Sequence, residues 1–156
     1  MIRPSGDGAE PGAEIMAQVR GMKVAASRSP GRGEPVYRGR RIAVVVPAYN
    51  EEDLIGETLS GIPDYVARVY AVDDGSTDRT GEIIEDYAQR DQRIVPIHHN
   101  PNRGVGAAIT TGYLQAVEDG MDIAAVMAGD NQMDPAYLPD LLDPIIDGRA
   151  DYTKGN

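Results

Sequence analysis

The sequence contains no cysteine, no tryptophan and no phenylalanine among its 156 residues. Without cysteine there can be no disulfide framework, no thiolate metal site and no cysteine nucleophile, and the absence fits a reducing compartment. The apolar core must rest on valine, isoleucine, leucine, alanine and the eight tyrosines. The chain is nevertheless long enough for one domain with a core of its own.

Long apolar runs and an excess of positive charge are also missing. No run approaches the roughly 20 apolar residues of a membrane-spanning helix, and the N-terminus lacks the apolar segment of a secretory signal. Lys and Arg number 15 against 25 Asp and Glu, which gives a net charge of −10. A general nucleic-acid binder needs a basic face to neutralise phosphates, so we expect a soluble protein with no nucleic-acid partner.

Residues 1–40 differ in composition from the rest of the chain. They are rich in Gly, Pro, Arg and Ser, which predicts a poorly ordered leader. A short helix over 14–26, "EIMAQVRGMKVAA", is the one regular element expected there. The folded domain is therefore expected over 41–156.

From Arg41 onward, strand-like and helix-like patterns alternate four times. We expect strands within 41–50, 66–75, 93–99 and 122–128, the start of another at 150–156, and helices over 51–62, 76–91, 102–120 and 134–147. Asn50 is the expected N-cap of the first helix, and Ser76 or Thr77 that of the second. This order predicts an α/β fold, a mostly parallel sheet with helices on both faces.

Four polar clusters follow the four expected strands: "PAYNEE", "DDGSTD", "HHNPNRG" and "AGDNQMDP". In open α/β sheets, ligands bind outside the carboxyl ends of the strands. We therefore expect these loops to form one binding site. For His98 and His99 a strand-end turn is the simpler interpretation, and metal ligation is the alternative.

Each cluster also has an interpretation of its own. Asp73 and Asp74 repel each other unless a cation or a donor-rich ligand, such as a base N–H or ribose hydroxyls, lies beside them; an Asp-Gly turn is the alternative. Arg103 and Gly104 at a helix start suit a diphosphate, or form a tight loop for close helix packing. Asp130 begins either a cation site or a polar turn.

Three other protein classes fit less well. A phosphoacceptor receiver domain has its Asp pair after the first strand, whereas this pair follows the second. A dinucleotide fold requires G-x-G-x-x-G after the first strand, but "GVGAAI" follows the third and ends in Ile109. A sugar-1-phosphate nucleotidyltransferase would have a Gly-rich, basic loop where this chain has the acidic "PAYNEE".

Taken together, five segments resemble one family in order and spacing. "VVVPAYNEE", "VDDGSTDRT", "NRGVGAA", "MAGDNQMDP" and "DYTKGN" are similar to the family 2 glycosyltransferases of GT-A fold, and most of all to polyprenyl-phosphate and dolichyl-phosphate sugar synthases. The resemblance covers residues 42–156. It implies inverting transfer of a sugar from a UDP- or GDP-sugar with Mg²⁺ or Mn²⁺, and it favours a polyprenyl phosphate acceptor at a membrane surface. The expected location is the cytoplasm, peripheral to the inner face of the membrane; the oligomeric state stays open.

The resemblance also implies roles for individual residues. The nucleoside pocket would include Pro47, Tyr49 and Glu51, with Asp73 or Asp74 on the base. Near the base and diphosphate would lie Arg103 and Gly104, and the metal motif would be Asp130 and Gln132. Lys154 either faces the acceptor or diphosphate or is simply exposed.

Two departures from the family pattern alter these expectations. The family pattern is Asp-x-Asp-x-Gln, where this chain has Ala128-Gly129-Asp130-Asn131-Gln132. We therefore expect binding of the cation to depend on bound nucleotide. Asp134 either compensates or caps the following helix. The acceptor-binding residues and any catalytic base would lie beyond Asn156, so a C-terminally incomplete domain is expected. The alternative function is a non-catalytic or truncated nucleotide-sugar-binding module.

Overall fold

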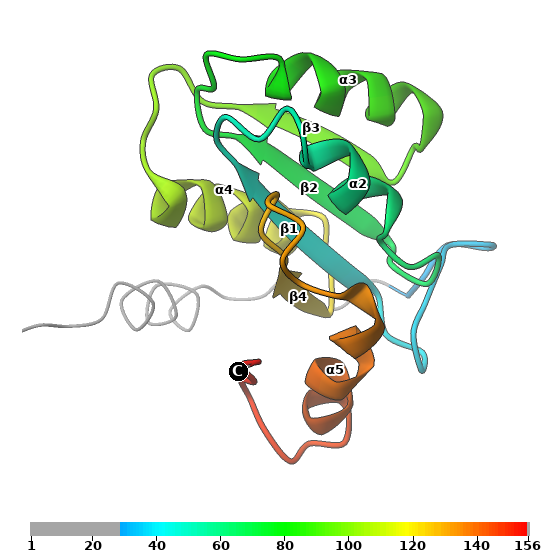
Figure 1. The fold of residues 1–156 in the computed structure, drawn as a ribbon. Coiled ribbons are helices and arrows are strands. Elements are labelled where there is room, and N and C mark those ends of the chain that lie inside the picture. The colour runs from blue at the N-terminus through cyan, green and yellow to red at the C-terminus, as the bar shows by residue number, and fades with distance from the viewer. Residues whose placement is uncertain (1–28, 156) are drawn as a thin grey trace, which may run out of the picture.

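The computed structural model describes residues 29–155, and its centre is a four-stranded parallel sheet. The strands lie in the order β3-β2-β1-β4 (Figure 1), with bounds β1 Ile42–Ala48, β2 Arg68–Asp73, β3 Ile94–His98 and β4 Ile123–Val126. Ala48 pairs with Asp73, and Asp73 pairs with His98. The carboxyl ends of the first three strands are therefore level, and the predicted parallel sheet is confirmed.

Helices cover both faces of this sheet. α4 (Val105–Glu118) lies on one face, and α2 (Ile55–Ser60) and α3 (Thr80–Arg90) lie on the other (Figure 1). A short 3₁₀ helix, η1 (Pro135–Tyr137), leads into α5 (Leu138–Ile146), which packs beside β4 on the α2 face. Among residues 29–155 no helix is long and apolar enough to cross a membrane.

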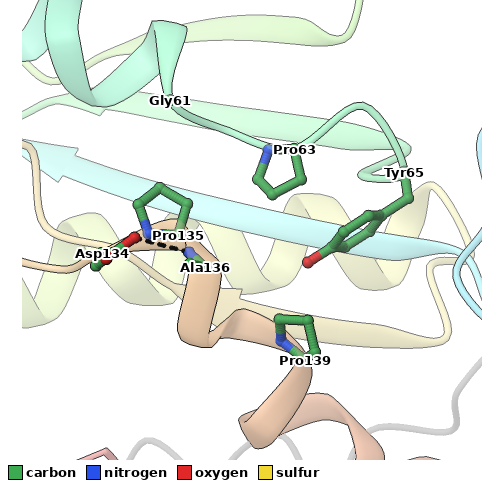
Figure 2. A pocket seen from close by; sticks show the side chains of 7 residues that line it. All are labelled: Gly61, Pro63, Tyr65, Asp134, Pro135, Ala136 and Pro139. Carbon is green, nitrogen blue, oxygen red and sulfur yellow. Dashed lines mark hydrogen bonds between the residues drawn. The ribbon is translucent and has the colours of Figure 1, made fainter.

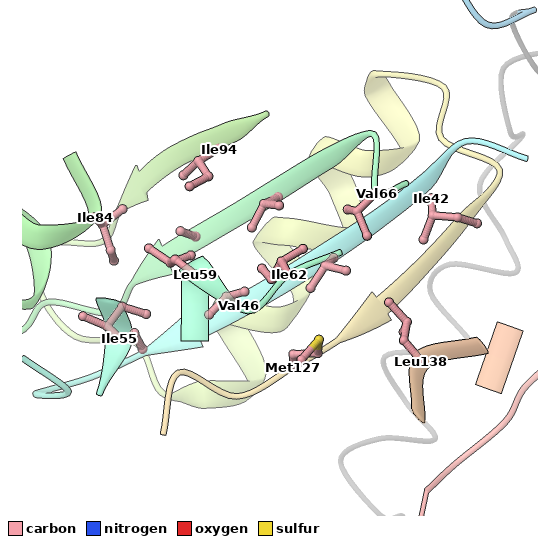
Figure 3. Close-up of a cluster of buried hydrophobic side chains, with 14 of the residues drawn as sticks. Ile42, Val46, Ile55, Leu59, Ile62, Val66, Ile84, Ile94, Met127 and Leu138 are labelled. Carbon is pink, nitrogen blue, oxygen red and sulfur yellow. The ribbon is translucent and has the colours of Figure 1, made fainter. Parts of the chain in front are cut away.

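β1 is buried on both sides because its side chains alternate between two cores. Ile42, Val44 and Val46 join the core under α2, α3 and α5 (Figure 3), whereas Ala43 and Val45 join the core under α4. All five side chains are fully buried. The continuous β-branched run is thus explained by helices on both faces.

α4 lies unusually close to β1 at Gly112. A Cβ atom at this position would overlap Val45 Cγ1 and come within 2.8 Å of Val45 Cγ2. Only a glycine allows this approach without a shift of the helix.

The strand order creates a topological switch point between β1 and β4. The chain runs from β1 outward to β2 and β3, and then returns to the opposite side of β1 as β4. The loop after β1 leads to α2 on one face of the sheet, and the loop after β3 leads to α4 on the other face. A crevice therefore opens at the carboxyl ends of the strands.

The expected helix caps are wrong in two places. The first helix begins at Ile55, and Asn50 (φ 53°) instead accepts a hydrogen bond from Thr77 N at 2.8 Å, because asparagine tolerates the left-handed conformation. α3 begins at Thr80, whose backbone N–H donates to Asp78 Oδ1 at 2.9 Å. Asn50 thus ties the β1 loop to the β2 loop, which local sequence does not reveal.

The ends of the described segment differ from expectation as well. No strand forms over 150–155; Thr153 Oγ1 instead donates to Leu141 O of α5 at 2.8 Å. Residues 34–40, assigned to the leader from the sequence, contact the domain: Arg38 pairs with Asp143 of α5 at 2.9 Å, and Glu34 with Arg41 at 2.7 Å. The helix expected over 14–26 lies outside the described residues.

Candidate functional site

A cleft of about 510 Å³ lies at the switch point, where four segments of the chain meet. One segment follows β1, one follows β2, one begins α4 and one follows β4. The lining residues are Pro47, Ala48, Tyr49, Glu51, Asp74, Asn102, Gly104, Val105, Ala108, Ala128, Gly129 and Asp130. The structure therefore brings all four predicted polar loops to one cleft.

Asp74 is a buried carboxylate in the wall of this cleft, with 2% of its surface exposed. Its Oδ1 accepts from Arg103 N at 2.9 Å and lies 2.7 Å from His99 Nδ1, while its Oδ2 accepts from Gly104 N at 2.7 Å. Burial raises the pKa of Asp74, but these hydrogen bonds outweigh it and hold the pKa below its ordinary value. Asp74 is thus ionised at neutral pH and fixed in orientation.

Asp73 points away from the cleft, because neighbouring side chains in a strand face opposite sides of the sheet. Its Oδ1 accepts from Ser76 N at 3.0 Å, and its Oδ2 lies 3.2 Å from His98 Nδ1. Each of the two adjacent carboxylates therefore has protein donors of its own. Of the pair, only Asp74 lines the cleft.

The loop after β1 forms a second wall. Tyr49 lines the cleft and is 48% exposed, so its side chain is accessible to a ligand. Glu51 N donates to Thr80 Oγ1 at 2.8 Å, which fixes the loop to α3. Burial, followed by the charges of Asp130 and Asp78, raises the pKa of Glu51.

The loop after β4 carries Asp130 and is held from both ends. Gly129 N donates to Pro47 O at 3.1 Å, and Gly129 O accepts from the buried Thr58 hydroxyl at 3.1 Å. Asn131, at φ 55°, donates through Nδ2 to Glu57 Oε2 at 3.0 Å. β1 and α2 therefore preset the position of this loop.

Asp130 and Gln132 differ in their placement. Asp130 lines the cleft, and its Oδ1 accepts from Gln132 N at 3.2 Å. The Gln132 side chain is exposed and is not among the lining residues. Asp134, expected either to compensate for Ala128 or to cap a helix, caps η1 by accepting from Ala136 N at 2.9 Å.

The cleft suits a divalent cation only if a ligand completes the coordination. Glu51 and Asp130 both line it, and the charge of Asp130 disfavours ionisation of Glu51, so a hard cation would relieve their repulsion. Over residues 29–155 there is no group of three or more His, Cys, Asp or Glu that could hold a metal. Asp130 therefore fits a cation shared with the oxygens of a ligand, not one enclosed by protein.

The start of α4 closes the cleft opposite β4. Gly104 has φ 92° and ψ 155°, a conformation that is essentially restricted to glycine. No side chain caps the helix, so free N–H groups and the positive end of the helix dipole face this region. The exposed Arg103 lies beside it and adds a positive charge.

Comparison with known proteins agrees with this arrangement. The family model of glycosyl transferase family 2 matches residues 43–156. The chain belongs to this family. The resemblance inferred from the five motifs is thus confirmed.

Two curated relatives belong to the polyprenyl-phosphate branch of the family. A UDP-N-acetylglucosamine–dolichyl-phosphate N-acetylglucosaminyltransferase of Methanococcus voltae is 30% identical over 128 residues, which are 74% of this chain and 51% of that protein. A polyprenol monophosphomannose synthase of Mycolicibacterium smegmatis is 31% identical over 143 residues, or 86% and 53%. The chain spans about half the length of the curated relatives it matches.

A solved structure supports the GT-A fold. A mannosyltransferase from Pyrobaculum calidifontis, in complex with GDP-Man and Mn²⁺, superimposes with a TM-score of 0.54 at 27% identity. The match covers 77% of this chain and 35% of the other. The fold class predicted from the alternation of strands and helices is confirmed.

Sequence reasoning missed the role of His99, which it interpreted as a strand-end turn. His99 is 7% exposed, and its ring bridges Asp74 and the Thr111 hydroxyl. The register of β2 and β3 would have revealed this, because Asp73 pairs with His98 and so brings Asp74 beside His99. Lys154 is exposed.

A second hollow, of about 350 Å³, lies between the α2–β2 loop and the start of α5 (Figure 2). Three of its seven lining residues are prolines, namely Pro63, Pro135 and Pro139. The Tyr65 hydroxyl is buried there with no hydrogen-bond partner in the described part of the chain. Asp134 and Pro135 at the end of the "MAGDNQMDP" segment line this hollow, but none of its lining residues lines the switch-point cleft.

Proposed function

We propose that this chain carries the donor-binding half of an inverting glycosyltransferase. The donor would be a UDP- or GDP-sugar bound with Mg²⁺ or Mn²⁺, and the acceptor a polyprenyl phosphate at the inner face of a membrane. The observation that carries the proposal is one cleft with a fixed anionic side chain, Asp74, and a second carboxylate, Asp130, from another loop. Family membership and the named relatives support it.

The nucleoside would lie between the β1 loop and Asp74. The exposed ring of Tyr49 offers an apolar face on which a base can stack. An ionised carboxylate accepts hydrogen bonds only, so Asp74 would receive an N–H of the base. Pro47 and Glu51 would complete the pocket, with Glu51 available to ribose hydroxyls.

The diphosphate would lie between the start of α4 and Asp130. The uncapped N–H groups of α4 and the Arg103 guanidinium suit phosphate oxygens. Asp130 would hold the divalent cation, and Gln132, two residues further along the same loop, would contribute its side-chain oxygen. When bound, that cation supplies positive charge against the negative charge that develops on the leaving diphosphate.

A phosphate acceptor fits the residues that this chain provides. The second pKa of a phosphate monoester is near 6, so the acceptor is largely a dianion at neutral pH and needs no protein base. A sugar hydroxyl would need a general base. The two relatives named above carry dolichyl phosphate or polyprenol in their names.

Calorimetric titration of UDP and of GDP, each with Mn²⁺, tests the proposal. We expect binding by the wild-type chain, and a loss of at least about tenfold in metal-dependent affinity for Asp130→Ala. Asp134→Ala is the matched control, because it removes a nearby carboxylate that only caps η1. Equal nucleotide binding by wild type and Asp130→Ala would overturn the metal assignment.

A second candidate is a nucleotide-sugar-binding module without catalysis. Ala128 favours it, because a methyl group lines the cleft where the family pattern has a first carboxylate. Incubation with a radiolabelled sugar nucleotide and a polyprenyl phosphate separates the two candidates. Lipid-linked label indicates the transferase, and nucleotide binding without labelled lipid indicates the module.

A further inference from the structure

Asp74 has little capacity left for a ligand. A carboxylate has about four hydrogen-bond positions, two on each oxygen. Oδ1 uses both of its positions, on His99 Nδ1 and Arg103 N, and Oδ2 uses one on Gly104 N. One position remains, on Oδ2, in a side chain that lines the cleft.

His99 keeps the carboxylate in this state. Because ionised Asp74 can only accept, the proton of the His99 ring must be on Nδ1. His99 Nε2 lies 2.9 Å from Thr111 Oγ1 of α4, which holds the far side of the ring. The ring is 7% exposed, so it cannot turn away without opening the core beside α4.

The three nucleobases differ in what they offer to such a carboxylate. Uracil presents a single N3–H between two carbonyl oxygens. Guanine presents N1–H and N2–H side by side, and pairs best with two free carboxylate oxygens. Cytosine has a lone pair at N3, which an anionic oxygen repels.

We propose that the hydrogen-bond chain Thr111–His99–Asp74 leaves one acceptor position for the base, so that the cleft selects uracil over guanine and the donor is a UDP-sugar. His99 acts here as a positioning residue that sets specificity through Asp74. This inference rests on the proposed function, because it takes Asp74 as the contact for the base. It goes further by naming the nucleotide.

The first test compares UDP, GDP and CDP, each with Mn²⁺, by calorimetry on the wild-type chain. We expect UDP to bind at least about tenfold more tightly than GDP and CDP. CDP is the matched ligand, since it keeps the pyrimidine ring, ribose and diphosphate but lacks N3–H. GDP binding as tightly as UDP would overturn the inference and leave the proposed function standing. If no nucleotide binds at millimolar concentration, the proposed function fails and the inference fails with it.

The second test isolates His99. His99→Leu removes the donor to Asp74 Oδ1 and so releases the carboxylate to turn both oxygens toward the two N–H groups of guanine. The affinity ratio of UDP to GDP should then fall to about threefold or less. His99→Asn places an amide N–H near the former Nδ1 and should restore the wild-type ratio. His98→Leu is the control, because His98 contacts Asp73 and Glu85 outside the cleft.

The ratio separates specificity from general damage. A variant that merely loosens the fold weakens UDP and GDP binding alike and leaves their ratio unchanged. An unchanged ratio in a folded His99→Leu variant would overturn the role of His99. Should His99→Leu fail to fold, Thr111→Val takes its place, because it releases the far side of the His99 ring, and an unchanged ratio there would overturn the role of His99.

Discussion

The adjacent carboxylates Asp73 and Asp74 should respond very differently to the same isosteric change. Asp74→Asn replaces one oxygen by an NH₂ group inside a cage of three donors, from His99, Arg103 and Gly104. The oxygen of the new side-chain amide can still accept hydrogen bonds. Its NH₂ group, however, then faces a buried N–H donor that an oxygen used to accept from. Hydrogen bonds to charged groups contribute about 1.5–3 kcal/mol each, and an unsatisfied buried donor costs about 1–3 kcal/mol more. We therefore expect Asp74→Asn to lower the free energy of unfolding by about 3–5 kcal/mol.

Asp73→Asn should cost about 1 kcal/mol or less. The amide oxygen can still accept from Ser76 N, and the amide NH₂ can donate to His98 Nδ1, whose Nε2 would then donate to Glu85. Urea denaturation of both variants measures the difference, and the melting temperature should fall by roughly 10 °C or more for Asp74→Asn alone. Nucleotide binding should be lost only in Asp74→Asn. Equal costs for the two substitutions would refute the assignment of Asp74 as the hydrogen-bonded centre of the cleft.

Two further predictions concern packing and pH. Gly112→Ala should lower the free energy of unfolding by about 1–2 kcal/mol, because overlap with Val45 outweighs the better helix propensity of alanine. Combined with Val45→Ala, it should cost less than the sum of the two single changes. Strict additivity in urea titrations would argue against the close approach. His98 is the second case. Burial lowers its pKa, but the hydrogen bonds that its protonated ring donates to Glu85 and Asp73 outweigh this, and the pKa is raised. Its contribution to stability is therefore complete below its ordinary pKa near 6.5 and is lost as the pH rises through the higher native value. The urea midpoint of the wild type should exceed that of His98→Gln in acidic buffer, and this difference should disappear in alkaline buffer. A difference that stays constant with pH would contradict this.

The strands were predictable because their sequence signal is local. The run from Ile42 to Ala48 is apolar at every position, and that pattern alone indicates a strand buried on both faces. The alternation of strand and helix then predicted the parallel sheet. The assembly of the four loops followed from general topology, since carboxyl ends of parallel strands share one edge.

The helix starts and the exact site were not predictable in the same way. Asn50 has the composition of an N-cap, yet it bonds Thr77 of another loop, and no local pattern distinguishes these uses. The choice between Asp73 and Asp74 required the pleat of β2, and the role of His99 required the register of β3. Contacts between loops decide such cases, and they become visible only once the strands are placed side by side.

Amide hydrogen exchange with and without UDP and Mn²⁺ tests the central claim most directly, because it locates the ligand on the chain. Binding in the cleft should slow exchange in the β1 loop near Tyr49, at the start of α4 near Gly104, and in the β4 loop near Asp130. The hollow near Tyr65 should be unchanged. Protection confined to that hollow, or no protection at millimolar UDP and Mn²⁺, would contradict the assignment of the switch-point cleft as the nucleotide site.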